Sequence, residues 1–91
     1  MANRTERPVR RDGVLVRRVD DVLVLLDPET GRYFQLNGVG ADVWELCNGD
    51  VTIDEIVTIL ERRYSVARST IFEDVEALLD SLLAEQLLSP G

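Results

Sequence analysis

The stretch GRYFQLNGVGADVWEL, residues 31–46, begins with the pattern of a β-strand and ends with the pattern of an α-helix. In its first half, over residues 32–36, side chains alternate so that Phe34 and Leu36 share one face of a strand. In its second half, apolar side chains recur at helical spacing instead. The stretch therefore predicts a strand that leads directly into a helix.

The change from strand to helix is predicted at Asn37. An asparagine side chain can accept a hydrogen bond from the first turn of a helix, so Asn37 is expected to cap a helix over residues 38–47. The pair Asn48-Gly49 then ends that helix. The glycines that follow Asn37 suit the close approach of backbone segments that such a change of structure requires.

Two apolar runs rich in β-branched residues precede this stretch, at residues 14–16 and Val22–Leu26. Both have the composition of strands. The pair Asp20-Asp21 suits a hairpin turn between them, and residues 27–31, with an early proline and a final glycine, suit the next turn. Three strands joined by short turns predict an antiparallel meander.

Two further helices are predicted after residue 51. Residues 52–55 (TIDE) and residues 70–73 (TIFE) both have the sequence of a capping box, which starts a helix. The last helix carries an apolar arc of about 140°, wider than the ~100° stripe of an ordinary surface helix. This arc consists of Ile71, Phe72, Val75, Leu78, Leu79, Leu82 and Leu83. The expected fold is an α+β domain, in which a three-stranded antiparallel sheet is followed by three helices in a winged-helix-like arrangement.

Length and charge limit the classes of protein. A chain of 91 residues is expected to form one small domain, here residues 13–88. Residues 1–12 are polar and rich in arginine, and are predicted to be a flexible arm. The ten basic residues are outnumbered by 17 acids, and the net charge of −7 opposes binding to nucleic acid.

Catalysis is not predicted for this chain. It has no histidine, so its one cysteine, Cys47, lacks an obvious general base and is expected to be a buried, inert thiol. Neither a cluster of metal ligands nor a Gly-rich phosphate loop occurs, so no metal or cofactor is expected. No apolar stretch approaches the ~20 residues that span a membrane, and a single cysteine fits a cytoplasmic protein. The sequence therefore favours a binding protein.

Winged-helix folds often read DNA, which makes DNA binding one alternative. A recognition helix exposes Arg, Lys, Asn or Gln to the bases. The last predicted helix instead carries the acids Glu73, Glu76, Asp80 and Glu85. DNA recognition is therefore disfavoured.

The third predicted strand, residues 32–36, has only one neighbour in a meander. Its other edge would carry unpaired N–H and C=O groups, to which an extended peptide can add as a further strand. The wide apolar arc of the last helix could supply pockets for the side chains of such a peptide. Periodicity alone does not distinguish this from an alternative, which it favours equally, in which the arc is ordinary core and the Arg-rich arm shields the edge.

A set of residues in a characteristic order extends from Leu26 to Leu88. It comprises DPETG (27–31), YFQLN (33–37), GA (40–41), VW (43–44), NG (48–49), Ile56, Leu60, Tyr64, DV (74–75), LL (78–79), Leu82 and LL (87–88). With this spacing the chain resembles the PqqD-like family, the RiPP precursor-recognition element, and most of all its stand-alone form from lasso-peptide biosynthesis. One departure is Gln86, where the family often has Gly.

This resemblance implies that the chain binds the leader of a ribosomally made precursor peptide, as an added strand beside the third strand and against the third helix. By position, the contacts would come from Arg32, Tyr33, Phe34, Gln35, Leu36, Asp74, Val75, Leu78, Leu79 and Leu82. The resemblance also implies delivery of the precursor to a cysteine-protease-like leader peptidase and an ATP-dependent, asparagine-synthetase-like lactam cyclase. Two alternatives stay open: a radical-SAM or other RiPP pathway, and an adaptor for a folded protein.

Overall fold

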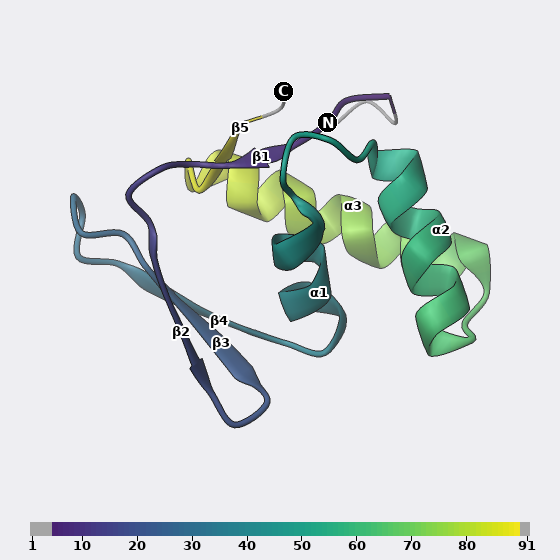
Figure 1. The fold of residues 1–91 in the computed structure, drawn as a ribbon, viewed down its shortest axis with the longest axis horizontal. Helices are drawn as coiled ribbons and strands as arrows, with labels where there is room; N and C mark the ends of the chain where they lie inside the picture. Colours follow the sequence, from purple (N-terminus) through teal and green to yellow (C-terminus); the bar gives the residue numbers. More distant parts are fainter. Residues whose placement is uncertain (1–4, 90–91) are drawn as a thin grey trace.

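The computed structural model describes residues 5–89. Its elements, in chain order, are β1 (Val9–Arg10), β2 (Leu15–Val19), β3 (Val22–Leu26), β4 (Tyr33–Asn37), α1 (Val39–Leu46), α2 (Ile53–Tyr64), α3 (Arg68–Ala84) and β5 (Leu88–Ser89). Figure 1 shows β2, β3 and β4 on one side of the molecule, α2 on the other, and α1 between them. The predicted α+β fold, a three-stranded antiparallel sheet followed by three helices, is confirmed.

Strands β2, β3 and β4 form an antiparallel meander in that order. Asp20, with a φ of 55°, makes the turn between β2 and β3 that the sequence predicts. On the face turned toward the helices, Leu25 lies opposite Phe34. Leu23 lies opposite Leu36 on the same face. The alternation predicted for β4 is therefore confirmed.

The helices bury one face of this sheet. Helix α1 packs against β4, α2 and α3, and α2 packs against α3. The buried apolar side chains form one core, which consists of Leu23, Leu25, Ala41, Val43, Trp44, Cys47, Ile53, Ile56, Val57, Leu60, Ile71, Val75, Leu79, Leu82, Leu87 and Leu88. Removal of these side chains from water, at about 25 cal/mol per Å² of apolar surface, is the main driving force for the fold. Because α1 contacts both β4 and α3, it sets how those two elements face each other.

The change from strand to helix differs from the prediction at Asn37. Asn37 is the last residue of β4 and pairs with Val22, so it does not cap α1. The cap is Gly38, which has a φ of 50° and no side-chain hydrogen bond. Since the sheet holds Asn37 extended, the chain reverses at the next residue, and glycine adopts a positive φ without steric cost.

One of the two predicted capping boxes is present. Glu55 N–H donates to Thr52 Oγ1 at 3.1 Å, and Thr52 N–H donates to the Glu55 carboxylate at 3.0 Å. The second predicted box is wrong, because α3 begins at Arg68, upstream of Thr70. The Arg68 guanidinium donates to the Asp54 carboxylate of α2 at 2.7 Å. A contact between helices therefore accompanies the earlier start of α3, which local sequence does not indicate.

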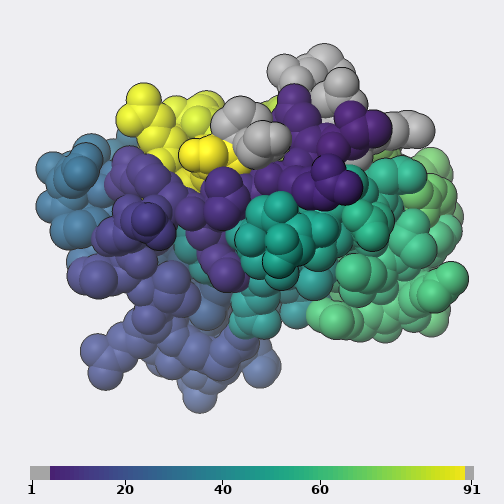
Figure 2. Space-filling model, turned by 45° about the horizontal axis from the view of Figure 1, so that its top comes forward, coloured from purple at the N-terminus to yellow at the C-terminus, as the bar shows by residue number. Residues whose placement is uncertain are grey.

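The segment before β2, predicted from the sequence as a flexible arm, makes backbone hydrogen bonds to two distant parts of the chain. Gly49 N–H donates to Pro8 C=O at 3.1 Å, and Arg10 N–H donates to Cys47 C=O at 3.0 Å. Strand β1 also pairs antiparallel with β5. Figure 2 shows this purple segment between the yellow C-terminal residues and the teal segment that follows α1. Long-range backbone hydrogen bonds thus hold the described part of the arm against the domain; residues 1–4 lie outside the described residues.

Helix α3 ends in a Schellman motif around Gln86. Leu87 N–H donates to Leu82 C=O at 2.9 Å, and Gln86 N–H donates to Leu83 C=O at 3.0 Å. Gln86 has a φ of 60°, the left-handed conformation that this position of the motif requires. The one departure from the family resemblance therefore falls where the backbone favours glycine.

Candidate functional site

Strand β4 has a free edge. It pairs with β3 on one side, and no other described strand pairs with it on the other. Where the ladder begins, Asp27 N–H donates to Arg32 C=O at 2.9 Å. The Arg32 C=O therefore points toward the β3 side. Because residues in an antiparallel ladder alternate in the direction of their hydrogen-bonding groups, the N–H and C=O groups of Tyr33, Gln35 and Asn37 point away from β3. These three residues offer the backbone groups to which a further strand would pair.

The sheet has a second free edge, along β2, and the two edges differ in charge. The sequence of β2 is LVRRV, so Arg17 and Arg18 stand next to each other on that edge strand. Charged side chains on an edge strand discourage pairing with another chain. The sequence of β4 is YFQLN, without any charge. Of the two edges, the one along β4 is therefore the better suited to strand addition.

A groove lies between β4 and α3. It consists of one cavity of about 330 Å³ and another of about 300 Å³, and both are lined by Gln35, Leu36 and Leu78. Asp74 of α3 lines the smaller cavity, and Ala84, its last residue, lines the larger one together with Glu85, so α3 runs along the groove from Asp74 to its C-terminal end. The complete lining of this β4–α3 groove is Phe34, Gln35, Leu36, Asn37, Val39, Gly40, Asp74, Leu78, Ser81, Leu82, Ala84 and Glu85.

Most of the residues expected at the site line this groove, namely Phe34, Gln35, Leu36, Asp74, Leu78 and Leu82. Gln35 does so along the strand edge, because it alternates with Phe34 and Leu36 and its side chain shares the outer side of the register with Tyr33. Val75 and Leu79 do not, because both are fully buried in the core behind the groove. Tyr33 has its backbone on the edge of β4, but its side chain is 63% exposed on the other face of the sheet. Arg32 precedes β4, and its guanidinium pairs with the Glu85 carboxylate at 2.6 Å.

Several residues of the groove carry no signal in the periodicity of the sequence: Asn37, Gly40, Ser81, Ala84 and Glu85. The packing of α1 brings Gly40 next to Leu36 and Leu78, where an added Cβ would lie 3.5 Å from Leu36 Cβ and 3.6 Å from Leu78 Cδ2. Gly40 does not have the positive φ that would require a glycine. A glycine within a helix, without a conformational reason, is the one signal that could have indicated this wall of the groove.

The chemistry of the groove is that of a binding site. Its middle is apolar at Leu78, and a carboxylate stands toward each end, Asp74 or Glu85. The one thiol of the chain, Cys47, is fully buried, and burial raises its pKa to about 12. A thiol with this pKa stays protonated at neutral pH and is a poor nucleophile. Across residues 5–89, no group of three or more His, Cys, Asp or Glu side chains could hold a metal ion.

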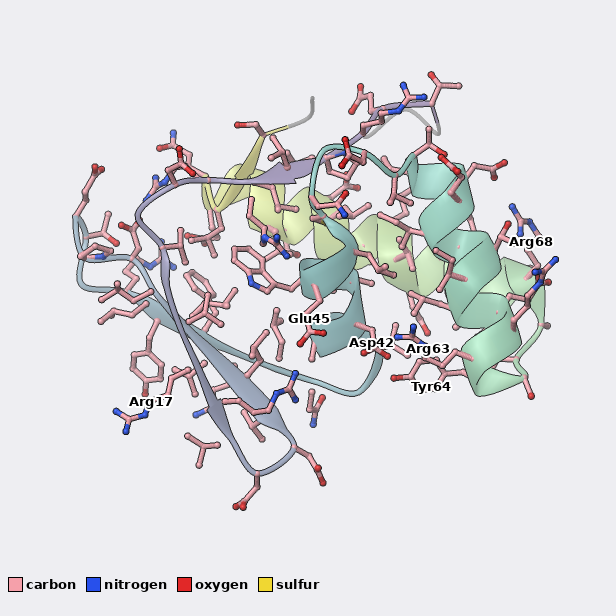
Figure 3. The ribbon with its side chains drawn as sticks, in the orientation of Figure 1. Arg17, Asp42, Glu45, Arg63, Tyr64 and Arg68 are labelled. Carbon is pink, nitrogen blue, oxygen red and sulfur yellow. The ribbon has the colours of Figure 1, made fainter. Side chains whose placement is uncertain are left out.

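The outer face of the sheet, turned away from the helices, is apolar as well. All five residues of β3 are apolar (VLVLL), as in strands covered on both faces, although only Leu23 and Leu25 are buried. We define the outer sheet face by the side chains Leu15, Val19, Val22, Val24, Leu26 and Tyr33, which share one side of the register with the polar residues Arg17, Gln35 and Asn37. Figure 3 shows Arg17 pointing away from the helices. Exposed apolar surfaces of this kind mark interaction sites.

The fold and the groove define a small α+β recognition domain with an open strand edge. Residues 23–88 match the family described as Coenzyme PQQ synthesis protein D (PqqD). The chain belongs to the PqqD family, and its resemblance to the PqqD-like RiPP recognition element is confirmed. A comparison with curated protein sequences gives no match. In the described part of the chain, no helix is both long and apolar enough to cross a membrane.

Three solved structures resemble this one. TbiB1, in complex with the TbiA(beta) leader peptide, is 35% identical, with a TM-score of 0.81 over 91% of this chain and 96% of that chain. A lasso peptide synthetase B1, complexed with the leader peptide, is 27% identical, with a TM-score of 0.81 over 92% of this chain and 99% of that chain. The PqqD truncation of Methylobacterium extorquens PqqCD, a functional and stand-alone RiPP recognition element, is 27% identical, with a TM-score of 0.81 over 98% of this chain and 95% of that chain.

Proposed function

We propose that this chain is a non-catalytic binding protein that captures the leader of a ribosomally synthesised precursor peptide by strand addition. It delivers the precursor to a leader peptidase and a lactam cyclase in lasso-peptide biosynthesis. The observation that carries the proposal is the uncharged free edge of β4, which lies along an apolar groove against α3. Two similar proteins in complex with leader peptides, TbiB1 and the lasso peptide synthetase B1, support the peptide as ligand. The second of them supports the lasso pathway as context.

The energetics of strand addition require the groove as well as the edge. Ordering a peptide residue costs roughly 1–2 kcal/mol of backbone entropy, while each backbone hydrogen bond returns a net of about 0.5–1.5 kcal/mol. Pairing with β4 alone is therefore close to break-even. Apolar side chains that become buried contribute about 1.5–3 kcal/mol each, so roughly three or four of them, at the upper end of this range, bring binding to about −9 to −12 kcal/mol. The two cavities that meet at Leu78 offer places for such anchors.

Delivery requires a second surface that remains accessible when the leader is bound. The outer sheet face meets this requirement, because it lies on the opposite side of the sheet from the core and its side chains Leu15 and Val19 are 55% and 51% exposed. A leader added to β4 would become the next strand of the same sheet. An enzyme that covers the outer sheet face would then lie next to the bound peptide, so the geometry suits transfer of the precursor to a modifying enzyme.

Binding of a leader peptide tests the proposal directly. Two labelled peptides are titrated with the chain in fluorescence polarisation: the TbiA(beta) leader and the leader of any precursor peptide that is encoded next to the gene for this chain. The tighter of the two serves as the probe leader in the experiments below. We expect a dissociation constant between about 1 nM and 1 μM, and amide chemical-shift changes that gather on residues 32–37 and 74–85. Absence of binding by both peptides, or shifts centred on α2, would overturn the proposal.

A further inference from the structure

An ion pair bridges the two walls of the β4–α3 groove at one end. Arg32 directly precedes β4, Glu85 directly follows α3, and their charged groups meet at 2.6 Å. The Arg32 side chain is 61% exposed and that of Glu85 is 31% exposed. The guanidinium also lies 5.6 Å from the centroid of the Phe34 ring, within the range of a cation–π contact. Arg32 thus makes the ion pair and the cation–π contact from one and the same position of its side chain.

A further cavity, the end cavity, lies beyond this ion pair. It measures about 200 Å³ and is lined by Arg11, Asp27, Glu29, Thr30, Arg32, Phe34, Ala84, Glu85 and Gln86. It shares Phe34, Ala84 and Glu85 with the larger cavity of the groove. The ion pair therefore stands at the boundary between the groove and this end cavity.

A peptide strand that pairs with the full length of β4 reaches this boundary. Tyr33, the first of the residues with backbone groups on the free edge, follows Arg32 immediately. Arg32 shares the inner face of the strand with Phe34, because the two are separated by one residue. An inward side chain of the added strand, at the position beside Arg32, consequently meets the ion pair and has to displace the guanidinium in order to enter the end cavity.

The charges around Glu85 decide which side chain can take the place of Arg32. Asp27 and Glu29 line the same cavity, and Arg11 is already paired with Asp27 at 2.9 Å. No basic residue occurs from residue 69 to the end of the chain, and Arg68, the first residue of α3, is paired with Asp54 and Glu61, so the part of α3 along the groove has no cation to replace Arg32. An apolar or acidic peptide side chain would leave the Glu85 carboxylate unpaired near two other carboxylates. A lysine or arginine of the peptide would replace the Arg32 guanidinium with another cation, so the Glu85 carboxylate would stay paired.

We infer that Glu85 is a specificity-determining residue, which selects a lysine or arginine side chain of the bound peptide by letting it replace the Arg32 guanidinium. The inference rests on the proposed function, since it concerns a peptide strand held along β4. It adds a subsite that binds a cationic side chain to a groove whose other walls select apolar side chains. The leader is therefore read by charge at one end of β4 as well as by apolar anchors in the middle.

A paired peptide scan tests this inference. Each position of the probe leader is changed in turn to Lys and to Gln, and both series are titrated against the native chain, Glu85→Gln and Arg32→Gln. At one position we expect the native chain to prefer Lys over Gln by about three-fold, the size of a partly exposed ion pair. Glu85→Gln should abolish the preference, and Arg32→Gln, which removes the competing cation, should increase it.

Two matched variants control for the change in net charge. Glu73→Gln removes an exposed acid of α3 outside the groove, and Arg62→Gln removes an exposed arginine of α2. Both should keep the preference of the native chain, and thermal melts show whether all four variants are folded. Two outcomes would overturn this inference alone. In the first, the probe leader binds but no position shows a preference for Lys that depends on Glu85. In the second, the preference for Lys is smaller in Arg32→Gln than in the native chain. Failure of the native chain to bind either leader would overturn the proposed function together with it.

Discussion

The Arg11 guanidinium lies 2.9 Å from the Asp27 carboxylate, and Asp27 is only 3% exposed. Arg11 follows β1, and Asp27 follows β3, so the pair ties the N-terminal segment to the turn that leads into β4. Glu29 N–H donates to the same carboxylate at 3.0 Å. The start of the free edge is thus held by a charged contact between segments that are far apart in the chain.

Stability should depend on pH through Asp27. Burial raises the pKa of its carboxyl group, but the Glu29 N–H and the Arg11 guanidinium outweigh burial, and the pKa falls below its ordinary value of 3.8. Because the folded-state pKa is lowered, Asp27 stabilises the fold above its unfolded-state pKa, and this contribution is lost as the pH falls through the folded-state pKa. Asp27→Asn should therefore be less stable than the native chain at neutral pH, with a difference that narrows below about pH 4 in urea unfolding. A difference that is the same at every pH would contradict this prediction, and Glu73→Gln provides the exposed control.

Leu78 and Leu79 are neighbours on α3 with different expected roles. Leu78 lines both cavities of the groove, whereas Leu79 is fully buried. Leu78→Ala should lower the affinity for the probe leader by about tenfold, because one apolar anchor is lost, with little change in melting temperature. Leu79→Ala should lower the free energy of unfolding by about 2–5 kcal/mol and leave the affinity of the folded fraction almost unchanged. Equal affinities for Leu78→Ala and the native chain, both folded by circular dichroism, would exclude Leu78 from the site.

Gly40→Ala should separate stability from binding. The added methyl group lies at ordinary contact distance, 3.5–3.6 Å, from Leu36 and Leu78, and alanine favours a helix over glycine by about 0.5–1 kcal/mol. We expect a higher melting temperature together with a several-fold lower affinity for the probe leader, because the methyl group fills part of the smaller cavity. Gly49→Ala is a control with the opposite expected effect on stability. Because Gly49 has a φ of 86°, alanine at this position should lower the melting temperature. An unchanged affinity in Gly40→Ala would show that no peptide side chain enters this cavity.

Gln86→Gly should stabilise the end of α3. A non-glycine residue in the left-handed region costs roughly 1–2 kcal/mol, and glycine removes that strain at the price of a more flexible unfolded chain. We expect a net gain of about 0.5–1 kcal/mol in urea unfolding, with Gln86→Asn between glycine and the native residue. A loss of stability in Gln86→Gly would mean that the glutamine side chain contributes more than its backbone strain costs.

The outer sheet face should be needed for delivery and not for capture. Leu15→Glu and Val19→Glu place a charge on this face without touching the groove. Both should keep the affinity for the probe leader within about two-fold and weaken binding to the leader peptidase by at least about tenfold, as expected at the centre of an interface. Ser69→Glu, an exposed position on α3, is the matched control for the added charge. Unimpaired peptidase binding by both variants, measured by biolayer interferometry, would place the enzyme contact elsewhere.

The sequence by itself determined the features that depend on neighbouring residues. The alternation of Phe34 and Leu36 placed both on the inner face of β4, and the hairpin at Asp20 followed from the conformations that aspartate tolerates. The capping box of Thr52 and Glu55 closes within one turn of helix. These features have local causes, so the meander, the order of the helices and the position of the free edge were all predictable.

Only the tertiary structure decided which residues line the groove. Periodicity put Leu78 and Leu79 on one wide arc, but the packing of α1 against α3 buried Leu79 and left Leu78 at the surface of the groove. The pairing of β1 with β5, the ion pair of Arg32 with Glu85 and the early start of α3 all join segments that are distant in the chain. Such contacts form because the packed core brings their partners together, and the pattern of either segment alone carries no signal for them.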